Sequence, residues 1–159
     1  MYHPGVWRRA FIAAAVGWAV ALVLAPSIAA RPDASPLYAF AFGIYAAGSI
    51  VCHQLPDRSF HLWGVQMPVC ARCTGIYVGG AAAAIVVYVV SAFRRTQVRL
   101  KPDTTYQRAR IALLVAALPT AATLLYEWTT GQTPANAIRA LAGFPLGAAV
   151  VWAIATDIN

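Results

Sequence analysis

The chain has 159 residues, of which 60% are hydrophobic and 11% charged, and its net charge is +7. Charged residues make up about 25% of a soluble domain, so this composition excludes an ordinary soluble protein. It is typical of an all-α integral membrane protein: a single transmembrane domain, residues 1–159, built as a polytopic helical bundle of about five spans. The positive charge lies mostly between apolar runs, which indicates topology signals and contact with the lipid bilayer, not nucleic-acid binding.

The first apolar run, from Ala10 to Ala25, follows a positively charged start and predicts a spanning helix. The same features are typical of a signal peptide, because residues 27–29 have the small-x-small form of a cleavage site. We favour the uncleaved helix, since the run lies at the upper limit of about 7–15 residues for a signal core. Cleavage of residues 1–29 would leave four spans.

A Ser-Pro pair at residues 35–36 predicts the start of the second helix. The apolar run that follows ends at Val51 and is shorter than the about 17–25 residues that span a bilayer. We therefore expect this helix to span by continuing to Pro56, which places Cys52 and His53 in its last turn.

A third helix is expected from Arg72 to Phe93, after a partly apolar loop over residues 56–69 at the membrane interface. Cys70 and Cys73 then lie at its N-terminus. Backbone amides and the helix dipole favour the thiolate form at this position, and thiolate is the form that binds metal or attacks disulfides.

A basic polar loop is predicted over residues 94–110, followed by a fourth helix over 111–128, with a kink at Pro119, and a fifth over 133–155. The third and fifth helices each carry a Gly-x-x-x-Gly motif that lets another helix approach closely. We interpret these motifs as helix packing, and they also permit a partner helix or a homo-oligomer; the glycines are Gly75, Gly79, Gly143 and Gly147.

Three cysteines and two histidines cluster on the second helix end, the loop and the third helix start. Three thiolates and one imidazole make a tetrahedral zinc set, and an iron–sulfur cluster is the alternative cofactor. His53 directly follows Cys52, and neighbours on a helix point about 100° apart, so both can bind one ion only if that turn unwinds. His61 on the loop is a substitute ligand. The predicted site spans 52–73, and its predicted metal ligands are Cys52, His53, Cys70 and Cys73.

Functions of three classes are compatible with this site. In a metal-dependent enzyme on a lipid-like or anionic headgroup substrate, three protein ligands leave one position open, and His53 or Glu127 acts as base. In a membrane thiol-disulfide oxidoreductase, Cys70 and Cys73 react and Cys52 resolves, although no thioredoxin-like βαβ pattern is present. In a non-catalytic accessory subunit, a structural metal pins the hairpin.

Alternating helices place Glu127, Asn136 and Arg139 at the face that carries the cysteines. Arg139 is expected about 9 Å inside the fifth helix and needs a partner, for which Glu127 is the natural candidate. The pair either clamps the last helices together or belongs to a site that holds a headgroup or phosphate. The predicted catalytic residues are His53, Glu127 and Arg139, and the predicted substrate-binding residues are Arg58, Arg72 and Asn136.

The direction of insertion has conflicting signals in a protein of five spans. The site would share its face with the N-terminus, so Arg8 and Arg9 favour a cytoplasmic site, while the basic residues of 94–110 favour an extracytoplasmic one. We expect a multi-pass protein of the cell membrane with the site outside, because arginines at the site serve chemistry and not orientation.

Residues 52–79 contain the sequences Cys-His-Gln, Arg-Ser-Phe and Pro-Val-Cys-Ala-Arg-Cys-Thr-Gly-Ile-Tyr-x-Gly. This order resembles the signature of the DUF2085 family of small bacterial and archaeal membrane proteins. The resemblance covers residues 40–150 and implies a membrane protein without specifying a reaction. Glu127 is the candidate for an acidic residue that members often carry, and the weaker second half of the pattern matches Pro119, Asn136, Arg139, Gly143 and Gly147.

Overall fold

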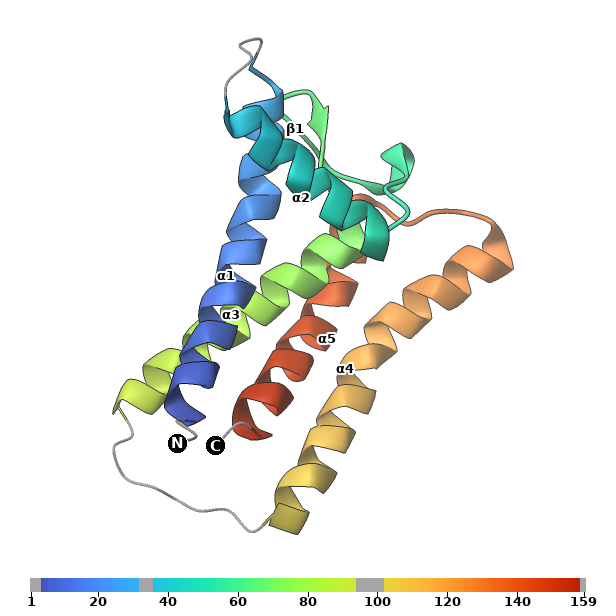
Figure 1. Cartoon of the computed structure of the whole chain (residues 1–159). Coiled ribbons are helices and arrows are strands. Elements are labelled where there is room, and N and C mark those ends of the chain that lie inside the picture. The colour runs from blue at the N-terminus through green and yellow to red at the C-terminus, as the bar shows by residue number, and fades with distance from the viewer. Residues whose placement is uncertain (1–3, 32–35, 94–101, 158–159) are drawn as a thin grey trace.

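The computed structural model describes residues 4–31, 36–93 and 102–157. In these residues it has five α-helices, one turn of 3₁₀ helix and a two-stranded antiparallel hairpin, with no other sheet (Figure 1). The predicted all-α helical bundle is confirmed. The elements are α1 (Pro4–Ala29), α2 (Leu37–Val51), η1 (Pro56–Arg58), β1 (His61–Leu62), β2 (Val65–Gln66), α3 (Ala71–Phe93), α4 (Pro102–Thr130) and α5 (Asn136–Asp157).

Four helices in the described residues are long and apolar enough to cross a membrane, namely α1, α3, α4 and α5. The second helix differs from expectation, because α2 ends at Val51 and Cys52 is already extended, with φ −146° and ψ 139°. Its 15 residues cover about 22 Å, short of the about 30 Å hydrocarbon core. The described residues therefore have four candidate spans, α1 among them, and α2 packs beside α1.

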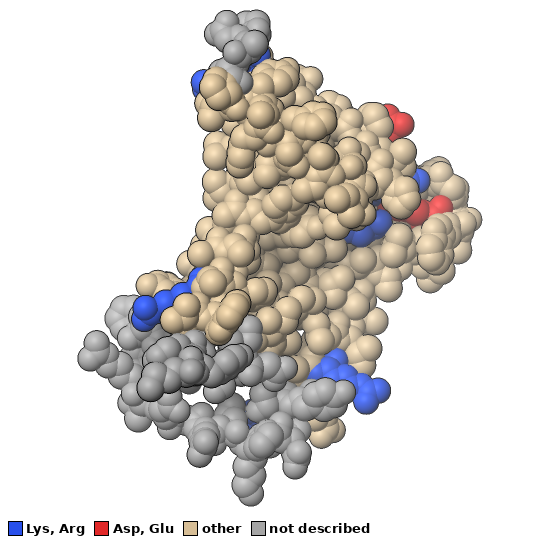
Figure 2. Space-filling model, in the orientation of Figure 1, with Lys and Arg blue, Asp and Glu red and all other residues tan. Residues whose placement is uncertain are grey.

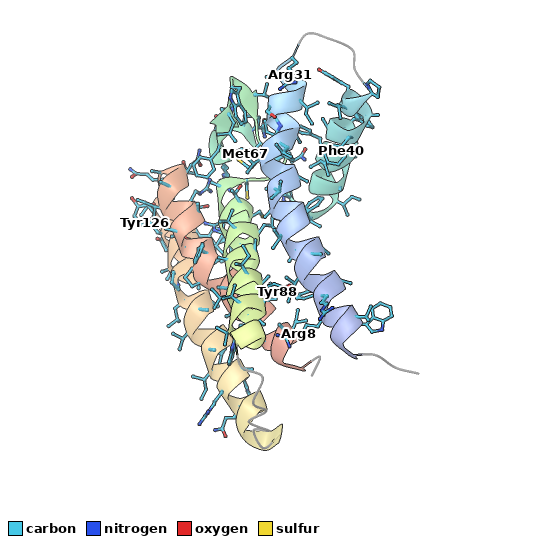
Figure 3. All side chains as sticks on the ribbon, turned by 90° about the vertical axis from the view of Figure 1, so that its left-hand side faces the viewer. Arg8, Arg31, Phe40, Met67, Tyr88 and Tyr126 are labelled. Carbon is cyan, nitrogen blue, oxygen red and sulfur yellow. The ribbon has the colours of Figure 1, made fainter. Side chains whose placement is uncertain are left out.

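The short α2 changes which end of the bundle carries the termini and which carries the cysteines. Both termini lie at one end of the bundle, and the α2–α3 junction lies toward the other (Figure 1). Arg31 and Met67 are found toward the junction end, whereas Arg8 and Tyr88 lie toward the terminal end (Figure 3). The expectation that the N-terminus shares a face with the cysteines is wrong for this fold, because the two lie toward opposite ends of the bundle and α2 is too short to count among the candidate spans.

Two predicted helix boundaries also shift. The helix α4 begins at Pro102, so the second half of the predicted basic loop, residues 102–110, forms its first turns, while residues 94–101 lie outside the described part of the chain. Pro102 suits a first helical position, where no backbone N–H bond is lost. The helix α5 begins at Asn136, so Arg139 lies about 4.5 Å from its start and not 9 Å.

The two glycine motifs pack against each other within the chain. The most extensive contact between elements joins α3 to α5. A Cβ atom on Gly75 would overlap the carbonyl oxygen of Ala140, and one on Gly147 would overlap that of Ile76. Gly79 and Gly143 are equally close to the facing backbone. The packing interpretation is confirmed, and these glycines are therefore not available to bind a second copy of the chain.

Replacing Gly147 by Ala is expected to destabilise the bundle by about 1–3 kcal/mol or more, because the added methyl group meets rigid backbone. Thermal unfolding in detergent measures the change. Gly17→Ala on α1 is the matched control, since a Cβ there meets open space and Ala favours a helix by up to about 1 kcal/mol. Equal unfolding temperatures for the two variants would contradict the close α3–α5 contact.

Candidate metal centre and the adjoining arginine cluster

The three cysteines converge at the α2–α3 junction. Cys52 directly follows α2, Cys70 directly precedes α3, and Cys73 lies in the first turn of α3. Their sulfur atoms all lie within 4.8 Å of one another. The backbone N–H of Cys70 also donates to the Cys52 sulfur at 3.1 Å. Cysteines distant in the sequence thus form one compact group.

Gln54 holds the two segments that carry these cysteines together. It has a left-handed backbone with φ 49°, which turns the chain sharply after Cys52. Its side-chain amide donates to the carbonyl oxygen of Tyr45 at 2.8 Å and to that of Pro68 at 2.7 Å. Gly48 makes the approach possible, because a Cβ there would overlap the Pro68 carbonyl oxygen. Sequence reasoning assigned Gln54 no role, although it stands in the Cys-His-Gln motif.

A tight hairpin covers the other side of the cysteine group. Trp63 and Gly64, at its turn, both have positive φ, which matches the two-residue type I′ turn of hairpins. Met67 and Val69, which follow the hairpin, are buried in one cluster with Leu22 and Cys52. Apolar side chains therefore bury Cys52 and partly cover Cys70 and Cys73.

The thiols are chemically different from one another. A hydrogen bond from the Cys73 thiol lowers the pKa of Cys70 to about 5, against the opposing effect of burial. The position of Cys70 just before a helix also favours the negative form. The group thus presents a thiolate at neutral pH next to two further thiols, which is a donor set of the kind that zinc prefers.

The spacing of the sulfurs fits a tetrahedral metal. A Zn–S bond of about 2.3 Å places two sulfurs about 3.8 Å apart in a tetrahedral site. The observed limit of 4.8 Å requires only small side-chain movements to reach that value. His53, in contrast, is exposed and is not part of the group, and His61 on β1 is also exposed. The described residues therefore bring together three of the four predicted metal ligands.

A second cluster lies around Glu127, near the end of α4. The guanidinium of Arg72 donates to Oε1 of Glu127 at 2.7 Å, and Nε of Arg139 donates to the same oxygen at 2.9 Å. Arg58 lies farther away, with 3.7 Å between its Nη1 and Oε2 of Glu127. The predicted pair of Glu127 and Arg139 is present, and it is part of a cluster of one acid and three arginines.

Polar side chains extend this arginine cluster. Arg72 also donates to the hydroxyl oxygen of Thr123 at 3.2 Å. The amide of Asn136, at the start of α5, donates to the carbonyl oxygen of Ser59 at 3.0 Å, next to Arg58. Thr123 and Ser59 were not predicted, because isolated hydroxyl residues in a membrane helix or loop have no distinctive spacing.

The cysteine group and the arginine cluster meet in the first turn of α3. Arg72 stands between Cys70 and Cys73 in the sequence, and residues one or two apart on a helix point in different directions. Its guanidinium reaches α4, while the backbone of Cys70 contacts the sulfur of Cys52, the residue directly after α2. Figure 2 shows blue and red atoms side by side on the face it presents, with uncharged surface around them.

The family model described as predicted membrane protein, DUF2085, matches residues 52–153. The chain belongs to the DUF2085 family. An uncharacterized protein of Methanocaldococcus jannaschii is 31% identical over 136 residues, which cover 85% of this chain and 81% of that relative. An uncharacterized protein of Methanothermobacter thermautotrophicus is 55% identical over 29 residues, 18% of this chain and 26% of its own length. No solved structure matches.

The DUF2085 match includes both clusters. It begins at Cys52 and runs past Arg139, so every predicted metal, catalytic and substrate-binding residue falls inside it. The helix α1 lies before the matched range, yet Leu22 of α1 packs directly against the cysteine group. The segment shared with the DUF2085 family thus carries the chemical groups, and α1 completes their apolar surroundings.

Proposed function

We propose that this membrane protein binds one zinc ion through Cys52, Cys70 and Cys73 and acts as a metal-dependent enzyme on a lipid-like substrate with an anionic headgroup. The observation that supports the metal is the mutual approach of the three sulfurs within 4.8 Å. Three thiolates fit zinc, and a site with three protein ligands keeps a position for substrate where the metal acts as a Lewis acid. The exposed position of His53 favours this open set over a closed one of four protein ligands.

The first test is the metal content of protein purified without oxygen, with free thiols counted on the same sample. We expect about one zinc per chain and no rapidly reacting thiol, because the thiolates are metal-bound. Absence of metal together with one disulfide and one free thiol would overturn the proposal and support the oxidoreductase. A zinc that no added small ligand can reach would support a structural metal in an accessory subunit.

Thiol-disulfide chemistry is the second candidate. It is favoured by Cys70 and Cys73, which form a CxxC motif at the start of α3, and by the pKa of about 5 at Cys70. Cys52, whose sulfur accepts a hydrogen bond from the backbone of Cys70, is placed to resolve a mixed disulfide. The same thiolate also suits metal binding, so the sulfur geometry supports both candidates and metal analysis separates them.

We further propose that the cysteine group faces away from the cytoplasm. Arg8 lies toward the end of the bundle at which α4 begins, with Arg108 and Arg110 in the first turns of that helix, whereas Arg31 lies toward the opposite end (Figures 1 and 3). The other described arginines toward the Arg31 end, Arg58, Arg72 and Arg139, all contact Glu127. In a five-span protein the N-terminal arginines and the basic residues that precede the fourth helix favour opposite orientations, whereas in a bundle of four spans both favour the same one.

This orientation predicts that a green fluorescent protein fused after Asn159 will fluoresce, and that alkaline phosphatase fused there will be inactive, because both report a cytoplasmic end. Alkaline phosphatase inserted after Arg31 is expected to be active. The reverse pattern at the two positions would place the cysteines in the cytoplasm and contradict the charge argument.

A further inference from the structure

The cluster around Glu127 has more positive than negative charge in a largely buried place. Side-chain exposure is 5% for Glu127, 3% for Arg139, 14% for Arg72 and 42% for Arg58. Within the described parts of the chain, no second acid pairs with any of these arginines. One carboxylate balances one guanidinium, so two positive charges are left over, one on a largely buried arginine and one on the half-exposed Arg58. Buried charge without a partner is unfavourable, and the cluster is therefore suited to an anion.

Two buried atoms in the cluster also have no hydrogen-bond partner among the described residues: Nε of Arg72 and Oδ1 of Asn136. The first is an N–H donor and the second is an acceptor. A ligand that satisfies the Arg72 atom must carry an acceptor oxygen. Phosphate, which is mostly dianionic at neutral pH, offers several acceptor oxygens, and a water bound beside it can donate to the Asn136 atom.

The backbone around the cluster favours the same kind of ligand. The helices α3 and α5 both begin at this end of the bundle, so their partially positive N-termini point toward it (Figure 1). Arg72 is the second residue of α3, and Arg139 is the fourth of α5. Guanidinium groups match the oxygens of phosphate with two parallel hydrogen bonds, which gives geometric selectivity as well as charge.

Arg58 provides the entry to this cluster. It is the most exposed of the three arginines and the most distant from Glu127, at 3.7 Å, and it belongs to η1 and not to a spanning helix. Its side chain therefore has freedom to turn from Glu127 toward an arriving anion. Arg72 and Arg139 are held close to the carboxylate and form the fixed inner wall.

We infer that Arg58, Arg72, Arg139 and Asn136 bind the phosphate of a phosphomonoester, with Glu127 holding the two inner arginines in place. This inference rests on the proposed function, for which it names the substrate class. The phosphate is that of a lipid headgroup or of a free ion, since both present the same oxygens. The position at the helix ends, where headgroups of a bilayer lie, is accessible to both.

The test is binding to the full chain in two settings. Thermal unfolding in detergent is followed with inorganic phosphate against sodium chloride of equal ionic strength, and binding is measured in phosphatidylcholine discs with and without phosphatidic acid. We expect phosphate or phosphatidic acid to stabilise the protein, and Arg58→Gln to weaken that binding about tenfold or more, as is usual for a lost charged hydrogen bond. Arg31→Gln, which changes an exposed arginine at the same end, is expected to have no effect.

Each outcome has a defined meaning. A response to both probes assigns a free phosphate site, and a response to phosphatidic acid alone assigns a lipid headgroup site. No response to either, or equal binding by Arg58→Gln and Arg31→Gln, overturns the inference. Zinc is measured on the same samples, so that zinc without phosphate binding refutes this inference alone, and phosphate binding without zinc refutes the metal proposal alone.

Discussion

Replacing Cys73 by Ser is expected to reduce bound zinc from about one per chain to almost none. The Ser hydroxyl does not ionise at neutral pH, so only two thiolates would remain, and His53 is too exposed in this fold to replace the third. Zinc binding to a structural site contributes about 10–16 kcal/mol, and most of that free energy depends on a complete ligand set. Zinc content after dialysis against a weak chelator measures the loss.

The matched comparison is His53→Ala. His53 adjoins Cys52 in the sequence but lies outside the sulfur group, so this variant is expected to retain its zinc. Cys52→Ser and Cys70→Ser, in contrast, are expected to behave like Cys73→Ser. If His53→Ala lost its metal as completely as the cysteine variants, the site would be a closed set of three thiolates and one imidazole, and the open position on which an enzyme depends would not exist.

The cysteine group was predictable because its signal is local. A CxxC motif at the start of an apolar helix fixes Cys70 and Cys73 about one turn apart, whatever the rest of the chain does. Cys52 was also placed correctly at a helix end, although the expected reason, an α2 that continues to Pro56, is wrong. What ends α2 is the extended Cys52 and the left-handed Gln54, and these are held by contacts with Cys70 and Pro68, respectively, that no local pattern reveals.

The position of the N-terminus was not predictable for the same reason. Fifteen apolar residues in α2 are consistent with either a short span or a helix that packs beside α1, and tertiary contacts decide between them. Glu127 was predicted to pair with Arg139, while Arg58 and Arg72 were predicted as nearby substrate-binding residues and not as partners of Glu127. Arg72 and Arg58 join it because the start of α3 and η1 both lie beside the end of α4, although Arg72 is 55 residues from Glu127 in the sequence and Arg58 is farther still.

Glu127→Gln is expected to destabilise the fold by about 3–5 kcal/mol, which is the usual cost of removing one partner from a buried ion pair. Gln keeps the size of the side chain, so the loss reports charge and not volume. The variant leaves the guanidinium groups of Arg72 and Arg139 without a counter-ion in a site where both side chains are largely buried. Thermal unfolding in detergent measures the change. Asp57→Asn is the control, because Asp57 is exposed on η1 and a surface change of this kind is usually within about 0.5 kcal/mol.

The same variant separates the two roles that Glu127 can have. If its carboxylate serves as counter-ion to the arginines, an added phosphate takes over that role, and phosphate should stabilise Glu127→Gln by more than it stabilises the unchanged protein. A carboxylate that serves as a general base would give a different result, since removing it would affect turnover while the response to phosphate stayed the same. Two short contacts from guanidinium groups to one oxygen favour the counter-ion, because those bonds compete with any proton that the oxygen would accept. An equal phosphate response in both proteins would assign Glu127 to the chemistry instead.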